Sequence, residues 1–90
     1  MKNTVSTHDI EKLMRDAKIE TQTIGDKTTF VMVTLKNGFV LCETSSCVDP
    51  KNYDEKTGEL AALNRITTRL WELEGYRLKY KIHEEGKRHA

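Results

Sequence analysis

Cysteine, proline and long apolar runs are scarce in this sequence of 90 residues. Its two cysteines cannot form the disulfide framework of a small secreted domain, and no second pair completes a zinc site. No wholly apolar run exceeds four residues, whereas a membrane-spanning helix needs about 20. The polar start at residues 1–3 is followed by no signal-peptide core. We therefore expect a soluble, intracellular protein that makes no contact with a membrane.

An excess of positive charge is missing as well. The 15 Lys and Arg residues nearly balance the 14 Asp and Glu residues, which leaves a formal net charge of +1. A protein that binds DNA or RNA polymers needs a basic surface to neutralise phosphates, so the balance argues against such a partner. The chain is short, 37% hydrophobic and free of repeats or linkers, which predicts a single domain over residues 1–90 with one modest core.

Apolar periodicity predicts an N-terminal helix over about residues 8–18. Its apolar residues recur at three- and four-residue steps and form one stripe, which consists of Ile10, Leu13, Met14 and Ala17. Ser6 precedes this stripe and Asp9 follows three positions later, which is the spacing of a capping box. The segment is therefore expected to lay one apolar face on the core.

Two segments rich in β-branched and aromatic residues follow, at about 28–36 and 39–45. Asn37-Gly38 lies between them and suits a tight type I′ turn, so we predict a β-hairpin. Residues 19–24 alternate more weakly and are a candidate third strand. The almost continuous apolar run at 30–33 indicates that both faces of the sheet are covered. In so short a chain a second subunit is the simplest cover, and we expect a homo-oligomer.

The second half of the chain predicts a long helix. Asp49-Pro50 is typical of a helix start, Asn52 is a second candidate cap, and apolar residues at helical spacing continue to about Leu73. Glu74-Gly75 then predicts the helix end. Residues 76–82 alternate like a strand but also suit a short final helix, and residues 84–90 are expected to form a flexible tail.

Together these elements predict an α+β fold. It consists of an N-terminal helix, a small antiparallel sheet centred on the hairpin at 28–45, and a long C-terminal helix packed on that sheet.

No catalytic or metal-binding constellation is evident. The three histidines have no Cys, Asp or Glu partner at metal-ligand spacing, and no glycine-rich phosphate loop is present. Cys42 falls on a predicted strand, where its default role is that of a small hydrophobe. Cys47 falls near a helix start but has no histidine base close in sequence. The sequence predicts a protein that is not an enzyme and that uses no cofactor or metal.

Four residues are candidates for binding an anion. Ser45 and Ser46 precede the predicted helix start, where hydroxyls and free amides can hold a phosphate, although turn and capping chemistry is the more common role of such residues. Arg65 and Arg69 lie four positions apart on the long helix and project from the same side. They could grip a phosphorylated ligand or simply pair with neighbouring glutamates.

Other polar and aromatic residues are candidates for contacting a base. Tyr53 and Trp71 could stack on it, and Asn52 or Glu43 could recognise its polar edge. Trp71 and Tyr76 bracket the predicted helix-ending glycine, however, and such aromatics usually close a corner of the core.

Spaced motifs also stand in a recognisable order over about residues 28–82. They are Thr34–Phe39, Glu43–Pro50, Asn52–Asp54 followed by Gly58, and Leu70–Tyr76. Their arrangement resembles a family of small tailed-phage accessory proteins labelled from coliphage N-four and Shigella phage Sf-six. The chain departs from that family by carrying Glu72 where proline is common, which puts a sharp helix break there in doubt.

The resemblance implies a phage protein that is encoded apart from the virion structural genes and acts in the host cytoplasm. Small phage proteins often act by stoichiometric binding, and some are oligomers that sequester cyclic nucleotide signals of host immunity. The first hypothesis is therefore a non-catalytic counter-defence protein that holds such a nucleotide through Glu43, Ser45, Ser46, Asn52, Tyr53, Arg65, Arg69 and Trp71. The alternative is a phage protein that inhibits or redirects a host protein by direct contact, without a small-molecule ligand.

Overall fold

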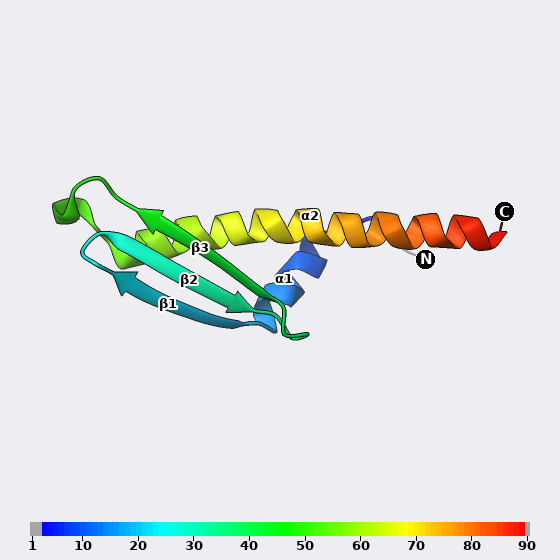
Figure 1. Ribbon diagram of the computed structural model, residues 1–90, viewed down its shortest axis with the longest axis horizontal. Coiled ribbons are helices and arrows are strands. Elements are labelled where there is room, and N and C mark those ends of the chain that lie inside the picture. Colours follow the sequence, from blue (N-terminus) through cyan, green and yellow to red (C-terminus); the bar gives the residue numbers. More distant parts are fainter. Residues whose placement is uncertain (1–2, 90) are drawn as a thin grey trace.

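The structure is a computed structural model that describes the backbone of residues 3–89 and the side chains of residues 3–87. Its elements are α1 (Thr7–Arg15), β1 (Lys18–Ile24), β2 (Thr28–Thr34), β3 (Val40–Ser46), a 3-10 helix (Pro50–Asn52) and α2 (Glu55–His89). The strands form one antiparallel sheet in the order β1-β2-β3, and α2 lies along one face of it (Figure 1). The expected α+β fold is confirmed, and the candidate third strand is present as β1.

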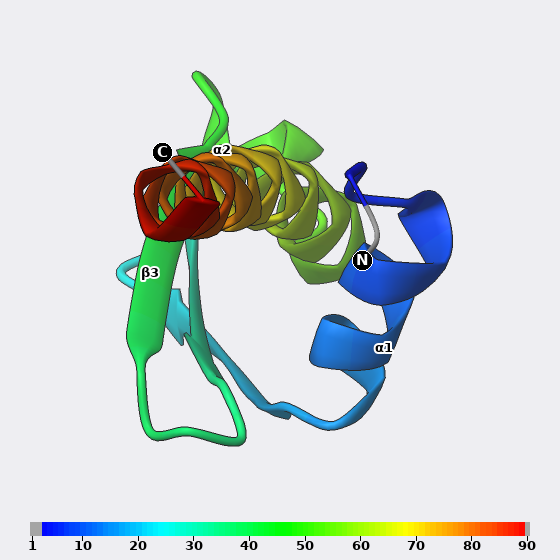
Figure 2. The ribbon, with the colours of Figure 1, turned by 90° about the vertical axis from the view of Figure 1, so that its right-hand side faces the viewer.

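The predicted capping box starts α1. The Ser6 Oγ accepts a hydrogen bond from the Asp9 backbone N–H at 3.2 Å, and the Asp9 carboxylate accepts one from the Ser6 N–H at 2.9 Å. Ile10 is buried, and the rest of the predicted stripe is partly buried against the same core. This apolar face holds α1 beside α2 (Figure 2).

The turn between β2 and β3 differs from the predicted type I′ turn. The Leu35 N–H donates to the Phe39 carbonyl and the Gly38 N–H donates to the Leu35 carbonyl, both at 2.8 Å. Gly38 has a φ of +91°, whereas Asn37 keeps a negative φ. A type I′ turn needs positive φ at both central residues, so this link is a type I turn that ends in a left-handed glycine. The longer connection confines the left-handed residue to the position that has no Cβ.

The start of α2 lies two residues beyond the 3-10 helix. Asp49 caps that short helix by accepting from the Lys51 N–H at 3.0 Å, as the Asp49-Pro50 pair predicted. The carboxylate of Asp54 accepts from the Thr57 hydroxyl at 2.6 Å, which lowers the pKa of Asp54. The second cap is therefore at Asp54 rather than at Asn52.

The predicted end of α2 at Glu74-Gly75 is wrong. Residues 76–82 are helical rather than a strand, and residues 84–89 continue the same helix; Ala90 lies outside the described residues. One glycine inside a helix costs only about 1 kcal/mol, and the residues that follow it are mostly good helix formers. Trp71 and Tyr76 are consequently exposed on the helix surface instead of closing a corner of the core.

The core lies between α2, α1 and the inner face of the sheet. Its buried apolar residues are Ile10, Val31, Val33, Leu35, Leu41, Ala62, Ile66 and Leu70. The outer face of the sheet carries half-buried Phe30 and Met32 and exposed Val40 and Cys42. No described element covers this face, so the second covering layer expected from the apolar run is not supplied by the chain itself. Cys42 lies on this outer face and is exposed.

Candidate functional site

Tyr53 fastens the start of α2 to the sheet. Its hydroxyl lies 2.7 Å from the Thr29 Oγ1 and 2.8 Å from the Thr23 Oγ1. Thr23 also donates to Glu55, and the neighbouring Thr21 donates to Glu59. Thr29 is completely buried, so the Tyr53 hydroxyl satisfies a polar group that water cannot reach. These contacts give Tyr53 a structural role in the described chain.

Arg65 and Arg69 close the free edge of β3. Arg65 donates to the backbone carbonyl of Thr44, and the Nη1 of Arg69 donates to the carbonyl of Cys42 at 3.0 Å. The same Nη1 lies 3.3 Å from the Glu43 carboxylate. Edge carbonyls that are not paired invite another strand, and the two arginines occupy them from α2.

Arg69→Ala is expected to lower the free energy of unfolding by about 1 kcal/mol, because a charge-assisted hydrogen bond and an ion pair are lost together. Urea unfolding monitored by circular dichroism measures the change. Arg77→Ala is the matched control on the same helix, since its ion pair with Glu74 is exposed and spans 3.7 Å. An equal loss from the two variants would contradict the edge-closing role.

No hydrogen bond joins the side chains of the remaining predicted residues to this pair of arginines in the described part of the chain. Ser45 faces α2 and lies opposite Thr29, whereas Ser46 faces the other side of the sheet and lies 2.7 Å from the Thr28 hydroxyl. Asn52 is exposed at the end of the 3-10 helix. Trp71 lines an open cavity of about 570 Å³ between α1 and α2, next to Ile10 and Met14 among others. The structure thus brings Glu43, Arg65 and Arg69 together and leaves Trp71 on another side of α2.

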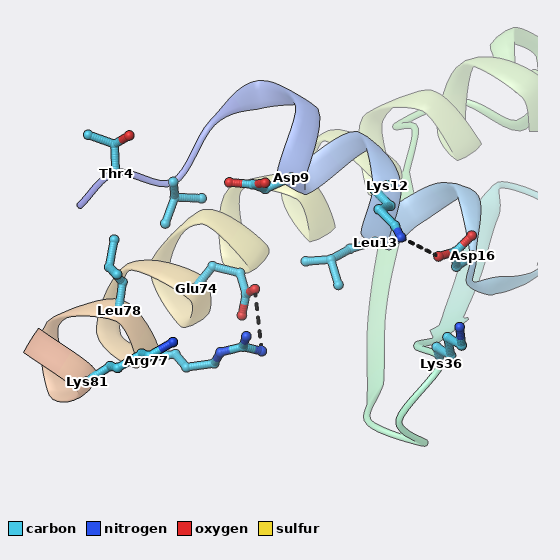
Figure 3. Close-up of a pocket in the computed structure, with 11 residues that line it drawn as sticks. Thr4, Asp9, Lys12, Leu13, Asp16, Lys36, Glu74, Arg77, Leu78 and Lys81 are labelled. Atoms are coloured by element: carbon cyan, nitrogen blue, oxygen red, sulfur yellow. Dashed lines mark ion pairs between the residues drawn. The ribbon is translucent and has the colours of Figure 1, made fainter. Parts of the chain in front are cut away.

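Two adjoining depressions lie where α2 passes beyond the sheet. The first, called here the hairpin–helix pocket, has a volume of about 420 Å³ and an apolar wall of Leu13, Leu35, Phe39, Leu70 and Leu73. Its polar lining is Lys36, Asn37, Glu74 and Arg77. The second, called the α1–α2 groove, has a volume of about 480 Å³ and runs on between the two helices to Lys81 (Figure 3). Leu13, Lys36, Glu74 and Arg77 line both, so the two depressions adjoin each other.

Cationic side chains from three elements line the α1–α2 groove. Lys12 pairs with Asp16 at 4.0 Å, and Arg77 pairs with Glu74 at 3.7 Å (Figure 3). The side chains of Lys36 and Lys81 have no hydrogen bond or ion pair within the described part of the chain. Two cations are therefore available to a ligand that carries negative charge.

The sequence matches a phage protein family, N4 Gp49/phage Sf6 gene 66, over residues 5–82. The chain belongs to this family. The match extends the resemblance, which the motifs carried over about 28–82, to the N-terminal helix. No curated protein and no solved structure matches the chain significantly.

In this phage protein, the hairpin–helix pocket lies wholly within the residues that match the family, and so does the α1–α2 groove apart from Thr4. The residue patterns alone did not indicate Lys36 or Arg77 as ligand contacts, and they placed Lys81, together with Lys79, among the cations that could grip a phosphorylated ligand only if residues 76–82 formed a strand. A helix that continues past Gly75 places Arg77 and Lys81 on one face, since they are four positions apart. This four-residue spacing is the sequence feature from which the two cations could have been predicted to share a face of the helix.

Two other kinds of site are not found in the described residues of the phage protein. No group of three or more His, Cys, Asp or Glu side chains is placed to hold a metal ion. No described helix is long and apolar enough to span a bilayer.

Proposed function

We propose that this phage protein acts by stoichiometric binding rather than catalysis, and that it sequesters a small phosphorylated nucleotide in the hairpin–helix pocket and the adjoining groove. The observation that carries the proposal is that the apolar wall of the hairpin–helix pocket lies next to the Lys36 and Lys81 side chains, which have no hydrogen-bond or ion-pair partner in the described part of the chain. The ligand class of the first hypothesis, a cyclic nucleotide that serves as an immune signal in the host cytoplasm, is the one proposed here.

The apolar wall suits the base of a nucleotide. Phe39 is 48% exposed and Leu73 is 41% exposed, although both border a concave surface floored by Leu35 and Leu70. Ligand pockets commonly combine such a wall with a few polar groups in a volume of about 300–1,000 Å³. A base that covers these side chains would remove their apolar area from water.

The polar lining suits phosphates and the edge of a base. Arg77 can exchange its long contact with Glu74 for paired N–H···O bonds to a phosphate, and Lys36 lines the same two depressions. Lys81 extends the cationic lining toward a second phosphate. The side-chain Oδ1 of Asn37 already accepts a hydrogen bond from the Phe39 backbone N–H at 3.0 Å. The side-chain NH₂ group of Asn37 is therefore left to donate to the base.

Replacing Lys36 and Arg77 together with alanine is expected to weaken binding of a cyclic dinucleotide at least tenfold. Hydrogen bonds to charged groups contribute about 1.5–3 kcal/mol each, so the loss of two exceeds that factor. Isothermal titration calorimetry against cyclic and linear nucleotides measures the affinity. Lys79→Ala is the matched control, because Lys79 is exposed on the same helix and lines neither depression.

The same titrations separate the two possible locations of the ligand. Unchanged affinity in the Lys36/Arg77 variant, with affinity lost from an Arg65→Ala, Arg69→Ala variant, would place the nucleotide at the β3 edge instead. The first hypothesis would then hold for the residues named from sequence. Absence of binding by the wild type to every nucleotide would remove the ligand class altogether.

A second candidate function is direct binding of a host protein, and the free surface of α2 favours it. Leu73, Tyr76 and Tyr80 follow helical spacing, Tyr76 is 72% exposed, and the two tyrosine rings lie 6.4 Å apart. An apolar helix stripe of this kind can enter a groove on a partner. The result that favours this function is retention of one stoichiometric host protein, without nucleotide, that Tyr76→Ser and Tyr80→Ser abolish.

A further inference from the structure

The two edges of the sheet differ in how they meet solvent. On β3, Arg65 and Arg69 occupy the outward carbonyls of Thr44 and Cys42. On β1, no described element lies along the outer edge, and α2 packs on the side of β2 and β3 (Figure 1). An unpaired strand edge is a template for another strand. The phage protein has blocked one of its two edges and left the other open.

The ladder identifies which groups of β1 face outward. At the two ends of the β2–β3 ladder, Leu35 bonds to Phe39 and Cys47 bonds to Lys27, so odd-numbered residues of β2 face β3. Even-numbered residues of β2 therefore bond β1. The odd-numbered residues of β1 consequently turn their N–H and C=O groups away from the sheet; they are Ile19, Thr21 and Thr23. No described group hydrogen-bonds to any of these six backbone groups.

We propose that two copies of this chain pair antiparallel through β1, with Thr21 of each copy at the twofold axis. β1 runs from Lys18 to Ile24, so Thr21 is its midpoint and this register pairs every residue of the strand. Ile19 then lies opposite the partner's Thr23, and all six outward groups of each copy are satisfied. The result is a six-stranded sheet in the order β3-β2-β1-β1-β2-β3.

Side-chain chemistry favours this register over its neighbours. Thr21 meets its own copy, and Glu20 lies opposite Gln22, so no like charges face each other. Centring the pair on Glu20 would oppose two carboxylates, and centring it on Gln22 would leave Lys18 and Ile19 without partners. Ile19 and Ile24, which are 42% and 50% exposed, both gain cross-strand neighbours across the new interface.

The register predicts a charge-swap test at the exposed residue Gln22. Gln22→Glu places two carboxylate pairs across the interface and is expected to raise the dimer Kd about tenfold, whereas Gln22→Lys adds two attractive pairs and is expected to lower it about tenfold. Combining Glu20→Lys with Gln22→Glu restores opposite charges and should recover the affinity. Sedimentation velocity over a range of concentrations measures each Kd.

Two further variants make the test specific. Thr44→Glu carries the same charge change on the same face of the sheet, but on β3, and is expected to leave the Kd unchanged. Glu59 accepts a hydrogen bond from Thr21, so the pairing brings the Glu59 carboxylates of the two copies near the twofold axis. Glu59→Gln removes the repulsion between these carboxylates and is expected to lower the dimer Kd. Circular dichroism verifies that each variant is folded.

Two results would overturn the proposal. One is a wild-type chain that stays monomeric up to millimolar concentration. The other is an oligomer whose Kd ignores the charge at residue 22, which would place the interface elsewhere. Neither result bears on nucleotide binding, because β1 does not line the hairpin–helix pocket or the α1–α2 groove.

Discussion

Replacing Gly58 with alanine is expected to lower the free energy of unfolding by about 1–2 kcal/mol. A Cβ at this position of α2 would lie 2.8 Å from the Thr29 Cβ and would overlap the Thr29 Oγ1. Thr29 is completely buried on the central strand and bonded to Tyr53, so it has little room to move. Overpacking of this kind costs about 1–3 kcal/mol or more and outweighs the gain of about 1 kcal/mol in helix propensity.

Gly75→Ala provides a control with the opposite sign. A Cβ at Gly75 meets no atom within 4 Å, and the residue lies inside the same helix. The substitution should therefore raise the free energy of unfolding by about 1 kcal/mol through helix propensity alone. Chemical denaturation measures the free energy of unfolding of both variants. A Gly58→Ala variant that is as stable as wild type would show that α2 does not approach the sheet so closely.

Replacing Ile66 with alanine is expected to cost about 3–4 kcal/mol of unfolding free energy. Ile66 is fully buried at the centre of the α2–sheet interface, and a truncated core side chain loses its transfer free energy and leaves a cavity. A domain of this size has a total stability of only about 5–13 kcal/mol, so the loss is a large share of it.

Leu60→Ala is the matched control for Ile66→Ala. It removes a similar side chain six positions earlier on α2, where Leu60 is exposed. Its expected cost stays within about 0.5 kcal/mol, and urea midpoints compare the two variants directly. Similar losses from both variants would contradict the placement of α2 on the sheet.

Elements whose signals are local could be predicted from the sequence. The capping box at Ser6 and Asp9, the apolar stripe of α1 and the Asp49 cap all depend on residues within one or two helical turns. The hairpin was also predictable, since Gly38 does supply the left-handed residue of its turn. Its turn type was not, because the closing pair of residues 35 and 39 depends on the register of the strands.

The length of α2 could not be settled by local signals. Gly75 is a common helix terminator, yet it takes a helical conformation here, because a single interior glycine is a weak obstacle between good helix formers. The i, i+3 ion pair of Glu74 and Arg77 spans the glycine and supports continuation. A helix that ended at Gly75 would not contain Arg77, Leu78 and Lys81, so the groove could not be predicted from the sequence.

The candidate site was harder to predict because it depends on tertiary placement. Arg65 and Arg69 do project from one side of α2, as their spacing indicated, but the structure gives them carbonyl acceptors on β3. Edge carbonyls leave no trace in sequence, since every residue has one. The pocket joins Lys36 of the hairpin to Arg77 of α2, and that meeting requires the strand register and the full helix together.

Native mass spectrometry of the wild-type chain, with and without a panel of cyclic and linear nucleotides, tests the central claim most directly. It reports bound mass and subunit number in one spectrum. Uptake of one nucleotide at a fixed ratio to the chain, with release of the unchanged nucleotide on denaturation, is the predicted result. A chain that retains no nucleotide from the panel, or that releases a chemically altered one, would contradict sequestration by this phage protein.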